Sequence, residues 1–221
     1  ISPVITLNLV TRISIMKITK ITPMFLDMYL IVKIETDNGI CGIGESGAWG
    51  YLEPSGVAIE KFGRYLLGKD PLLIEHHWQY MYRFSHFRGS AIMGAISAID
   101  IALWDIAGQH FGTPVYQLLG GKVRDKARAY CHVFGETKAD LVKGILDAKN
   151  EGFTAVGHLT PFLDEDRSEK YFKTHADKIS DAIQTVEMYR DSVGNEVDLC
   201  IEIHRRLTPT EAVQLGRGIE Q

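Results

Sequence analysis

Alternating apolar and polar residues near the start of the chain predict an antiparallel sheet. Residues 17–22, 29–36 and 40–45 each follow the two-residue period of a strand with one buried face. The tripeptide DNG at residues 37–39 joins the second and third segments, and Asn-Gly between apolar runs is typical of a tight hairpin turn. We therefore expect a three-stranded meander.

A longer apolar period follows and predicts helices. Residues 74–83 and 92–110 repeat apolar side chains at intervals of three and four, as one helix face requires. In the second helix that face carries Ile92, Ile96, Ile99, Leu103 and Ile106. Gly112 and Pro114 are typical of a helix end, so the helix is expected to stop before them.

Glycine and proline punctuate residues 47–56 (GAWGYLEPSG), which predicts a loop between the sheet and the helices. The loop carries two aromatic residues, Trp49 and Tyr51. A loop of this kind can close over a ligand. The alternative is that both aromatics only pack against the domain.

After Gly120-Gly121 the pattern changes to strands that alternate with helices. Such alternation predicts a parallel sheet. The expected strands are residues 127–133, 154–159 and 197–204, and the expected helices are residues 138–150, 175–192 and 209 onward. The change divides the chain into two expected domains, residues 16–126 and 127–221.

The two ends of the chain lead to two further predictions. Residues 1–15 precede Met16, a second plausible start, and are interpreted as an extension that need not be native. Three parallel strands do not close a barrel, and a complete eight-unit barrel takes about 250 residues. We therefore expect an incomplete barrel, with further structure following Gln221 or docking against the open sheet.

The last helix has a clear start. Thr208 and Glu211 form the pattern of a capping box, and Pro209 lies at the first helical position. This pattern predicts a helix that begins at Pro209 and continues to the end of the chain.

Composition excludes several classes of protein. The 221 residues are 45% hydrophobic and 24% charged with a formal net charge of −4, which is typical of a globular domain. Lysine and arginine are scattered, so we expect neither nucleic acid nor a membrane surface as a partner. No apolar run approaches the roughly 20 residues of a membrane span. The only cysteines, Cys41, Cys131 and Cys200, lie far apart, which favours a soluble, cytoplasmic protein.

The third expected strand brings an acid and a histidine together. The two-residue period of residues 197–204 places Asp198, Cys200, Glu202 and His204 on one face. Glu202 and His204 lie at the carboxyl end of the strand, where strand-helix barrels hold their active sites. A carboxylate that binds Mg²⁺ beside an imidazole that moves a proton suits metal-assisted proton transfer. The alternative is a pair of rim residues without a function.

His132 occupies the same position on the first strand of the barrel. Arg128, Tyr130 and His132 share one face of residues 127–133, and His132 lies at the carboxyl end. It could contact the same ligand, or it could be a hydrogen-bonded structural histidine.

Three passages resemble the mandelate racemase and muconate lactonizing enzyme branch of the enolase superfamily. They are VKIETDNGICGIGE at residues 32–45, AISAIDIALWDIAGQHFGTPVYQLLGG at residues 95–121, and IEIHRRLTPTEA at residues 201–212. The resemblance implies an α+β capping domain followed by an α/β part, a modified TIM barrel that is incomplete here. The segment EIHRRLTP is most similar to mannonate-dehydratase-like members.

The resemblance also implies roles for single residues. Glu202 matches a magnesium ligand, His204 matches an acid catalyst, and His132 matches a substrate-contacting histidine. Trp49 and Tyr51 would reach over the substrate from the capping domain. The implied cofactor is Mg²⁺, the implied partner is a small-molecule sugar acid, and the implied assembly is a homo-oligomer.

The second barrel strand departs from the branch. Racemases and cycloisomerases carry Lys-x-Lys where this chain has Gly157 and Leu159, which disfavours lysine-based racemization. Mannonate dehydratases have arginine at the position of Gly157, so authentic mannonate dehydration is also in doubt. By the strand period, His158 is expected to be out of phase with the site.

The leading hypothesis is a magnesium-dependent dehydratase of sugar acids, a hydro-lyase. The remaining metal ligands and the base would lie beyond Gln221, so the 221 residues alone are expected to be inactive. Two alternatives stay open: a racemase or epimerase of the same superfamily, and a non-catalytic or regulatory protein with the same fold.

Overall fold

The structure is a computed structural model that describes residues 15–163, 173–204 and 206–220. The chain forms two compact units, Ile1–Val123 and Arg124–Gln221, and each is described by itself. Residues 1–14 of the expected amino-terminal extension lie outside the described residues.

The first unit begins with the expected antiparallel meander. Its strands are β1 (Ile18–Leu26), β2 (Tyr29–Thr36) and β3 (Cys41–Ser46), in the order β1-β2-β3. Gly39 takes a φ of 86° in the turn between β2 and β3, which a residue with a side chain rarely adopts. Alternation along β2 buries Leu30, Val32 and Ile34 completely. The predicted hairpin is therefore confirmed.

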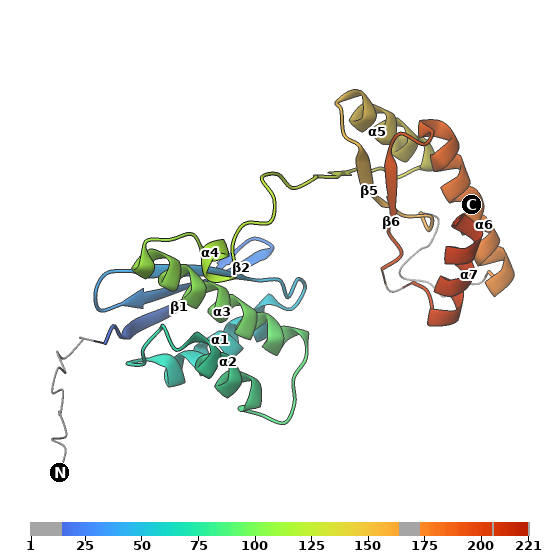
Figure 1. The fold of residues 1–221 in the computed structure, drawn as a ribbon. Coiled ribbons are helices and arrows are strands. Elements are labelled where there is room, and N and C mark those ends of the chain that lie inside the picture. The colour runs from blue at the N-terminus through green and yellow to red at the C-terminus, as the bar shows by residue number, and fades with distance from the viewer. Residues whose placement is uncertain (1–14, 164–172, 205, 221) are drawn as a thin grey trace, which may run out of the picture. The chain divides into compact units, whose positions relative to one another are not determined.

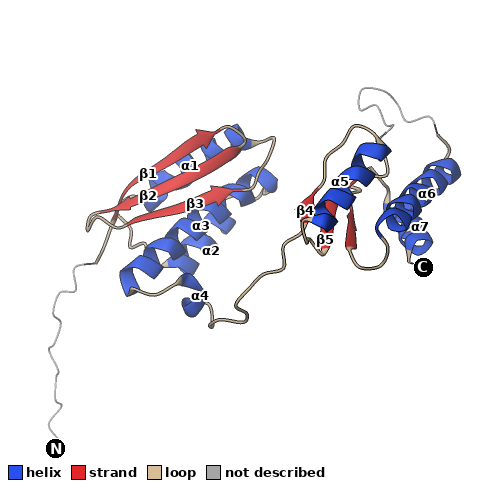
Figure 2. Cartoon of the chain, turned by 90° about the horizontal axis from the view of Figure 1, so that it is seen from above, coloured by secondary structure: helices blue, strands red, loops and turns tan. Residues whose placement is uncertain are grey.

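Helices cover one face of this sheet (Figures 1 and 2). They are α1 (Leu52–Leu66), α2 (Ile74–Arg83), α3 (Ser90–Phe111) and the short α4 (Val115–Leu118). The apolar face predicted for α3 is buried, and Gly112 ends the helix with a left-handed φ of 61°. Both α2 and α3 were predicted within two residues at each end.

The central helix α3 lies unusually close to β3 because that strand carries glycines. A Cβ atom added at Gly42 would approach the Ala102 carbonyl oxygen to 2.0 Å, and one at Gly44 would approach the Ala98 carbonyl oxygen equally closely. The apolar residues of α3 thus pack directly on the strand. The helix is long and apolar enough to cross a membrane by length and composition alone, but half of its most apolar window is buried in this core.

The prediction of a loop at residues 47–56 is confirmed only for its first half. Helix α1 begins at Leu52, so the loop ends at Tyr51, which serves as the N-cap residue. Pro54 lies in the first turn, where its missing N–H leaves no helical hydrogen bond unmade. The sequence reasoning missed α1 because glycine and proline were interpreted as loop residues throughout this segment.

The second unit has the expected order of strands and helices. Its parallel sheet has the order β4-β5-β6. The elements are β4 (Cys131–His132), α5 (Lys138–Asn150), β5 (Ala155–Leu159), α6 (His175–Val193), β6 (Asp198–Ile201) and α7 (Pro209–Ile219). The predicted alternation of strands and helices around a parallel sheet is thus confirmed.

Two strands are shorter than predicted. β4 starts four residues late, and the Arg128 side chain, rather than a strand ladder, donates hydrogen bonds to Thr154 and Asp198. β6 ends at Ile201, and three residues further on His204 has a φ of 39° and so leaves the extended conformation. Glu202 still donates its backbone N–H to the Leu159 carbonyl oxygen at 2.8 Å.

Helices α6 and α7 lie side by side (Figures 1 and 2) and are joined by a buried carboxylate. Glu211 completes the predicted capping box with Thr208 and also accepts hydrogen bonds from Lys178 and His175 of α6. The Lys178 ammonium and the Thr208 backbone N–H lower the pKa of Glu211 to about 2. The acid that caps α7 therefore also holds it against α6.

Candidate functional site

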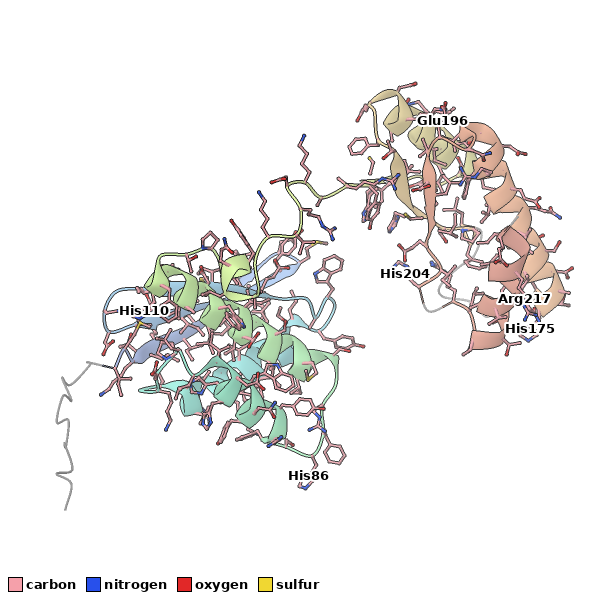
Figure 3. The ribbon with its side chains drawn as sticks, viewed as in Figure 1. His86, His110, His175, Glu196, His204 and Arg217 are labelled. Carbon is pink, nitrogen blue, oxygen red and sulfur yellow. The ribbon has the colours of Figure 1, made fainter. Side chains whose placement is uncertain are left out.

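Glu202 and His204 meet just beyond the carboxyl end of β6. The Nε2 atom of His204 lies 3.2 Å from the Oε1 atom of Glu202. The Glu202 side chain is 33% exposed and the His204 side chain is 49% exposed, so both reach solvent. Figure 3 shows His204 on the segment that leaves β6. The left-handed turn of His204, rather than a continued strand, lets the pair meet.

His132 lies at the carboxyl end of β4 and is held by Tyr130. The Tyr130 hydroxyl lies 2.8 Å from the His132 Nε2 atom. Gly157 of the neighbouring strand makes room for this pair, because a Cβ atom there would come within 2.4 Å of the Tyr130 ring. Gly157 stands where the resemblance implies lysine or arginine. Because it has no side chain, it leaves the space that the Tyr130 ring occupies.

A β-bulge in β5 changes which residues face the site. Val156 pairs with Leu199 and Leu159 pairs with Ile201, so β5 advances three residues while β6 advances two. His158 absorbs the extra residue with a left-handed φ of 65°. As a result, Val156 and Leu159 both enter the core beneath the helices.

This bulge corrects the expectation that His158 is out of phase with the site. Leu159 is fully buried. His158 was expected to be out of phase, but its ring centroid lies 5.5 Å from that of His132 and 6.3 Å from that of His204. The sequence held one indication of this, because an isolated glycine within a strand, here Gly157, often marks a bulge.

The three carboxyl ends thus bring together His132 of β4, His158 of β5, and both Glu202 and His204 just after β6. Beside them lies a cavity of about 560 Å³. Its lining contains both apolar and polar side chains. It includes Phe134, Phe162, Glu136, His158, Thr160 and Arg206. Such a mixture can exclude water from a ligand and still bind its polar groups.

Trp49 and Tyr51 belong to the other unit. They are 66% and 64% exposed and lie in the loop between β3 and α1. Neither side chain belongs to the buried core of its unit. Their role in substrate binding stays a prediction.

Glu202, the predicted magnesium ligand, places a carboxylate just beyond the carboxyl end of β6. Glu202 can supply one oxygen ligand, and magnesium requires several in octahedral geometry. Within residues 15–163, 173–204 and 206–220, no group of three His, Cys, Asp or Glu side chains is arranged to hold a metal ion. These residues therefore do not form a complete magnesium site by themselves.

Comparison with known proteins places the chain in a family. Residues 5–120 match the model of the mandelate racemase / muconate lactonizing enzyme N-terminal domain. The chain is 38% identical over 207 residues to a D-galactonate dehydratase of Klebsiella pneumoniae (strain 342). That match covers 93% of this chain and 53% of the relative, so the chain spans about half of its length.

Solved structures agree with this likeness. A member of the enolase superfamily from Salmonella Typhimurium superposes with a TM-score of 0.80 at 30% identity, over 93% of this chain and 59% of that one. An enolase from Pantoea ananatis with bound D-gluconate and magnesium superposes with a TM-score of 0.79 at 26% identity, over 93% and 57%. The chain therefore belongs to the mandelate racemase and muconate lactonizing enzyme family of the enolase superfamily.

Proposed function

We propose that this chain is part of a magnesium-dependent hydro-lyase that dehydrates a sugar acid. The observation that carries the proposal is the Glu202–His204 pair at the carboxyl end of β6, with His132 on β4. The names of the D-galactonate dehydratase relative and the gluconate-bound neighbour support the substrate class. We further propose a cytoplasmic protein, in line with its three free cysteines.

In the proposed reaction the α-carbon of the acid loses a proton to a base, and the β-carbon loses its hydroxyl group. His204 donates a proton to that hydroxyl, which departs as water, and the resulting enol becomes a 2-keto-3-deoxy acid. Glu202 lies within hydrogen-bonding distance of the His204 imidazole and so orients it before the transfer. His132, oriented by Tyr130, binds a polar group of the substrate.

Magnesium would be held by Glu202 together with oxygen ligands beyond the described residues. When bound, it stabilises the negative charge that develops on the substrate carboxylate as the α proton leaves. Because Glu202 is the only magnesium ligand predicted among the described residues, the 221-residue chain alone is expected to bind magnesium weakly and to remain inactive.

The proposal is tested on the purified protein at its natural length, established by intact mass. D-Galactonate, D-gluconate and their stereoisomers are incubated with and without Mg²⁺, and the keto acid product is measured after reaction with semicarbazide. We expect product only when Mg²⁺ is present. Inversion at C2 with no loss of water would instead indicate the racemase, and binding without turnover would indicate a regulatory protein.

The acid role of His204 has a separate test. In D₂O, a His204→Asn variant is expected to retain exchange of the α proton while dehydration falls by about 10²- to 10⁴-fold, because only the second step needs the acid. His110→Asn, which changes an exposed histidine at the end of α3, serves as the control. Equal loss of exchange and dehydration would contradict this assignment.

The expected homo-oligomer also stays a prediction. Light scattering of the purified protein measures it directly.

A further inference from the structure

The bulged residue His158 is the strongest candidate for a further role. Three described residues other than glycine have a positive φ, namely Asp27, His158 and His204, and two of these lie at the candidate site. A left-handed residue other than glycine is strained within a strand, and such residues concentrate at functional sites. The left-handed conformation of His158 therefore indicates a functional position.

The backbone on both sides of His158 is fixed by its neighbours. The Gly157 carbonyl oxygen accepts the Val133 N–H at 3.0 Å, and the Leu159 carbonyl oxygen accepts the Glu202 N–H at 2.8 Å. Beyond the strand, Tyr189 donates its hydroxyl to the Thr160 carbonyl oxygen at 3.0 Å. Burial raises the pKa of Tyr189 to about 12, so it remains a neutral donor. The bulge is thus held by three separate contacts.

The His158 ring packs against two other rings. Its centroid lies 4.8 Å from the Phe134 ring and 5.5 Å from the His132 ring. The side chain is only partly buried and lines the cavity that also contains Thr160 and Arg206. An imidazole that packs against rings at the wall of a cavity with polar and apolar lining is suited to bind one polar group of a ligand.

From this geometry we propose that His158 is a specificity-determining residue whose imidazole hydrogen-bonds a hydroxyl group of the sugar acid. A neutral imidazole both donates and accepts, and a sugar hydroxyl does the same, so the two are complementary. The inference rests on the proposed sugar-acid function, because it names the side chain that hydrogen-bonds a substrate hydroxyl group beside His204. His158 has no part in the proton transfers.

Substitution must respect the left-handed backbone. Asparagine tolerates a positive φ and glycine adopts it freely, so His158→Asn and His158→Gly are both expected to fold. Each should raise the KM for the preferred sugar acid about tenfold while kcat changes less than threefold, since one hydrogen bond is lost from binding. Discrimination between epimers should fall by a similar factor. His110→Asn is the matched control.

A second measurement does not depend on turnover. D-Gluconate or D-galactonate with Mg²⁺ is titrated into protein with labelled histidines, and the ring resonances absent from His158→Asn are followed. A saturable shift supports the inference even if no acid is dehydrated, in which case only the proposed function fails. If an acid is dehydrated but KM and the His158 resonances do not change, the inference is wrong and the function stands. Loss of kcat at constant KM would also overturn it, in favour of a proton-transfer role.

Discussion

At the scale of single residues, backbone conformation decides what side chains can do in both units. Gly42 and Gly44 let α3 approach β3 to a distance that no other residue allows. His158 and His204 use left-handed conformations to turn their rings toward each other. These four positions show that the geometry of helix packing and of the candidate site depends on a few exceptional residues.

The close approach of α3 makes Gly44→Ala strongly destabilising. The added methyl group would meet the Ala98 carbonyl oxygen at 2.0 Å, so the helix must move away from β3. We expect the free energy of unfolding to fall by about 1–3 kcal/mol, as for other overpacked cores. Urea denaturation measures this. Gly47→Ala is the control, because nothing lies within 4 Å of its added methyl group; equal effects of the two changes would contradict the packing account.

At the scale of elements, hydrophobic periodicity predicted most of the fold. It located α2, α3, α5 and α6, and the capping box located α7. It failed for α1, where glycine and proline in the first turns resemble a loop, and for the length of β4. Hydrophobic periodicity shows which face of a helix is buried. It does not locate the start of a helix whose first turns contain glycine and proline, because these residues are typical of loops.

The candidate site was predictable to a similar extent. Glu202, His204 and His132 could be proposed from their places at strand ends, and the structure brings the three strand ends together. His158 could not be proposed, because an extra residue in β5 reverses the strand period from that point onward. A bulge depends on pairing with neighbouring strands, which one strand's sequence does not contain.

The contact between α6 and α7 is expected to depend on pH. The pKa of Glu211 is lowered to about 2, below its ordinary value near 4.5, so the ionised carboxylate stabilises the folded state above pH 4.5. That stability is lost as the pH falls from about 4.5 to 2. Glu211→Gln should therefore flatten the decline of the thermal midpoint over this window, as measured by circular dichroism.

Glu187→Gln provides the comparison for that experiment, because Glu187 is an exposed acid on the same helix α6. It removes the same charge without touching the contact with α7. The acid decline should persist in this variant. If it flattens as much as in Glu211→Gln, the decline comes from general charge and the proposed contact is not its cause.

At the scale of the whole molecule, the chain consists of two compact units joined by an exposed segment. Residues 122–130 are solvent-exposed and contain no helix or strand. Limited trypsin digestion should cut first at Lys122, Arg124 or Lys126 and leave each unit intact, because exposed irregular segments are cleaved most readily. Mass spectrometry of the early fragments identifies the sites. First cuts within α3 or α6 would contradict this division.

The central claim is that Glu202 belongs to a magnesium-dependent site for sugar-acid dehydration. The most direct measurement is the rate of keto acid formation, with saturating Mg²⁺, by the natural-length protein and its Glu202→Gln variant. The account predicts that the variant folds normally but loses at least about 10³-fold in kcat/KM, which corresponds to about 4 kcal/mol of transition-state stabilisation. Magnesium-dependent turnover that persists in the folded variant would contradict the account.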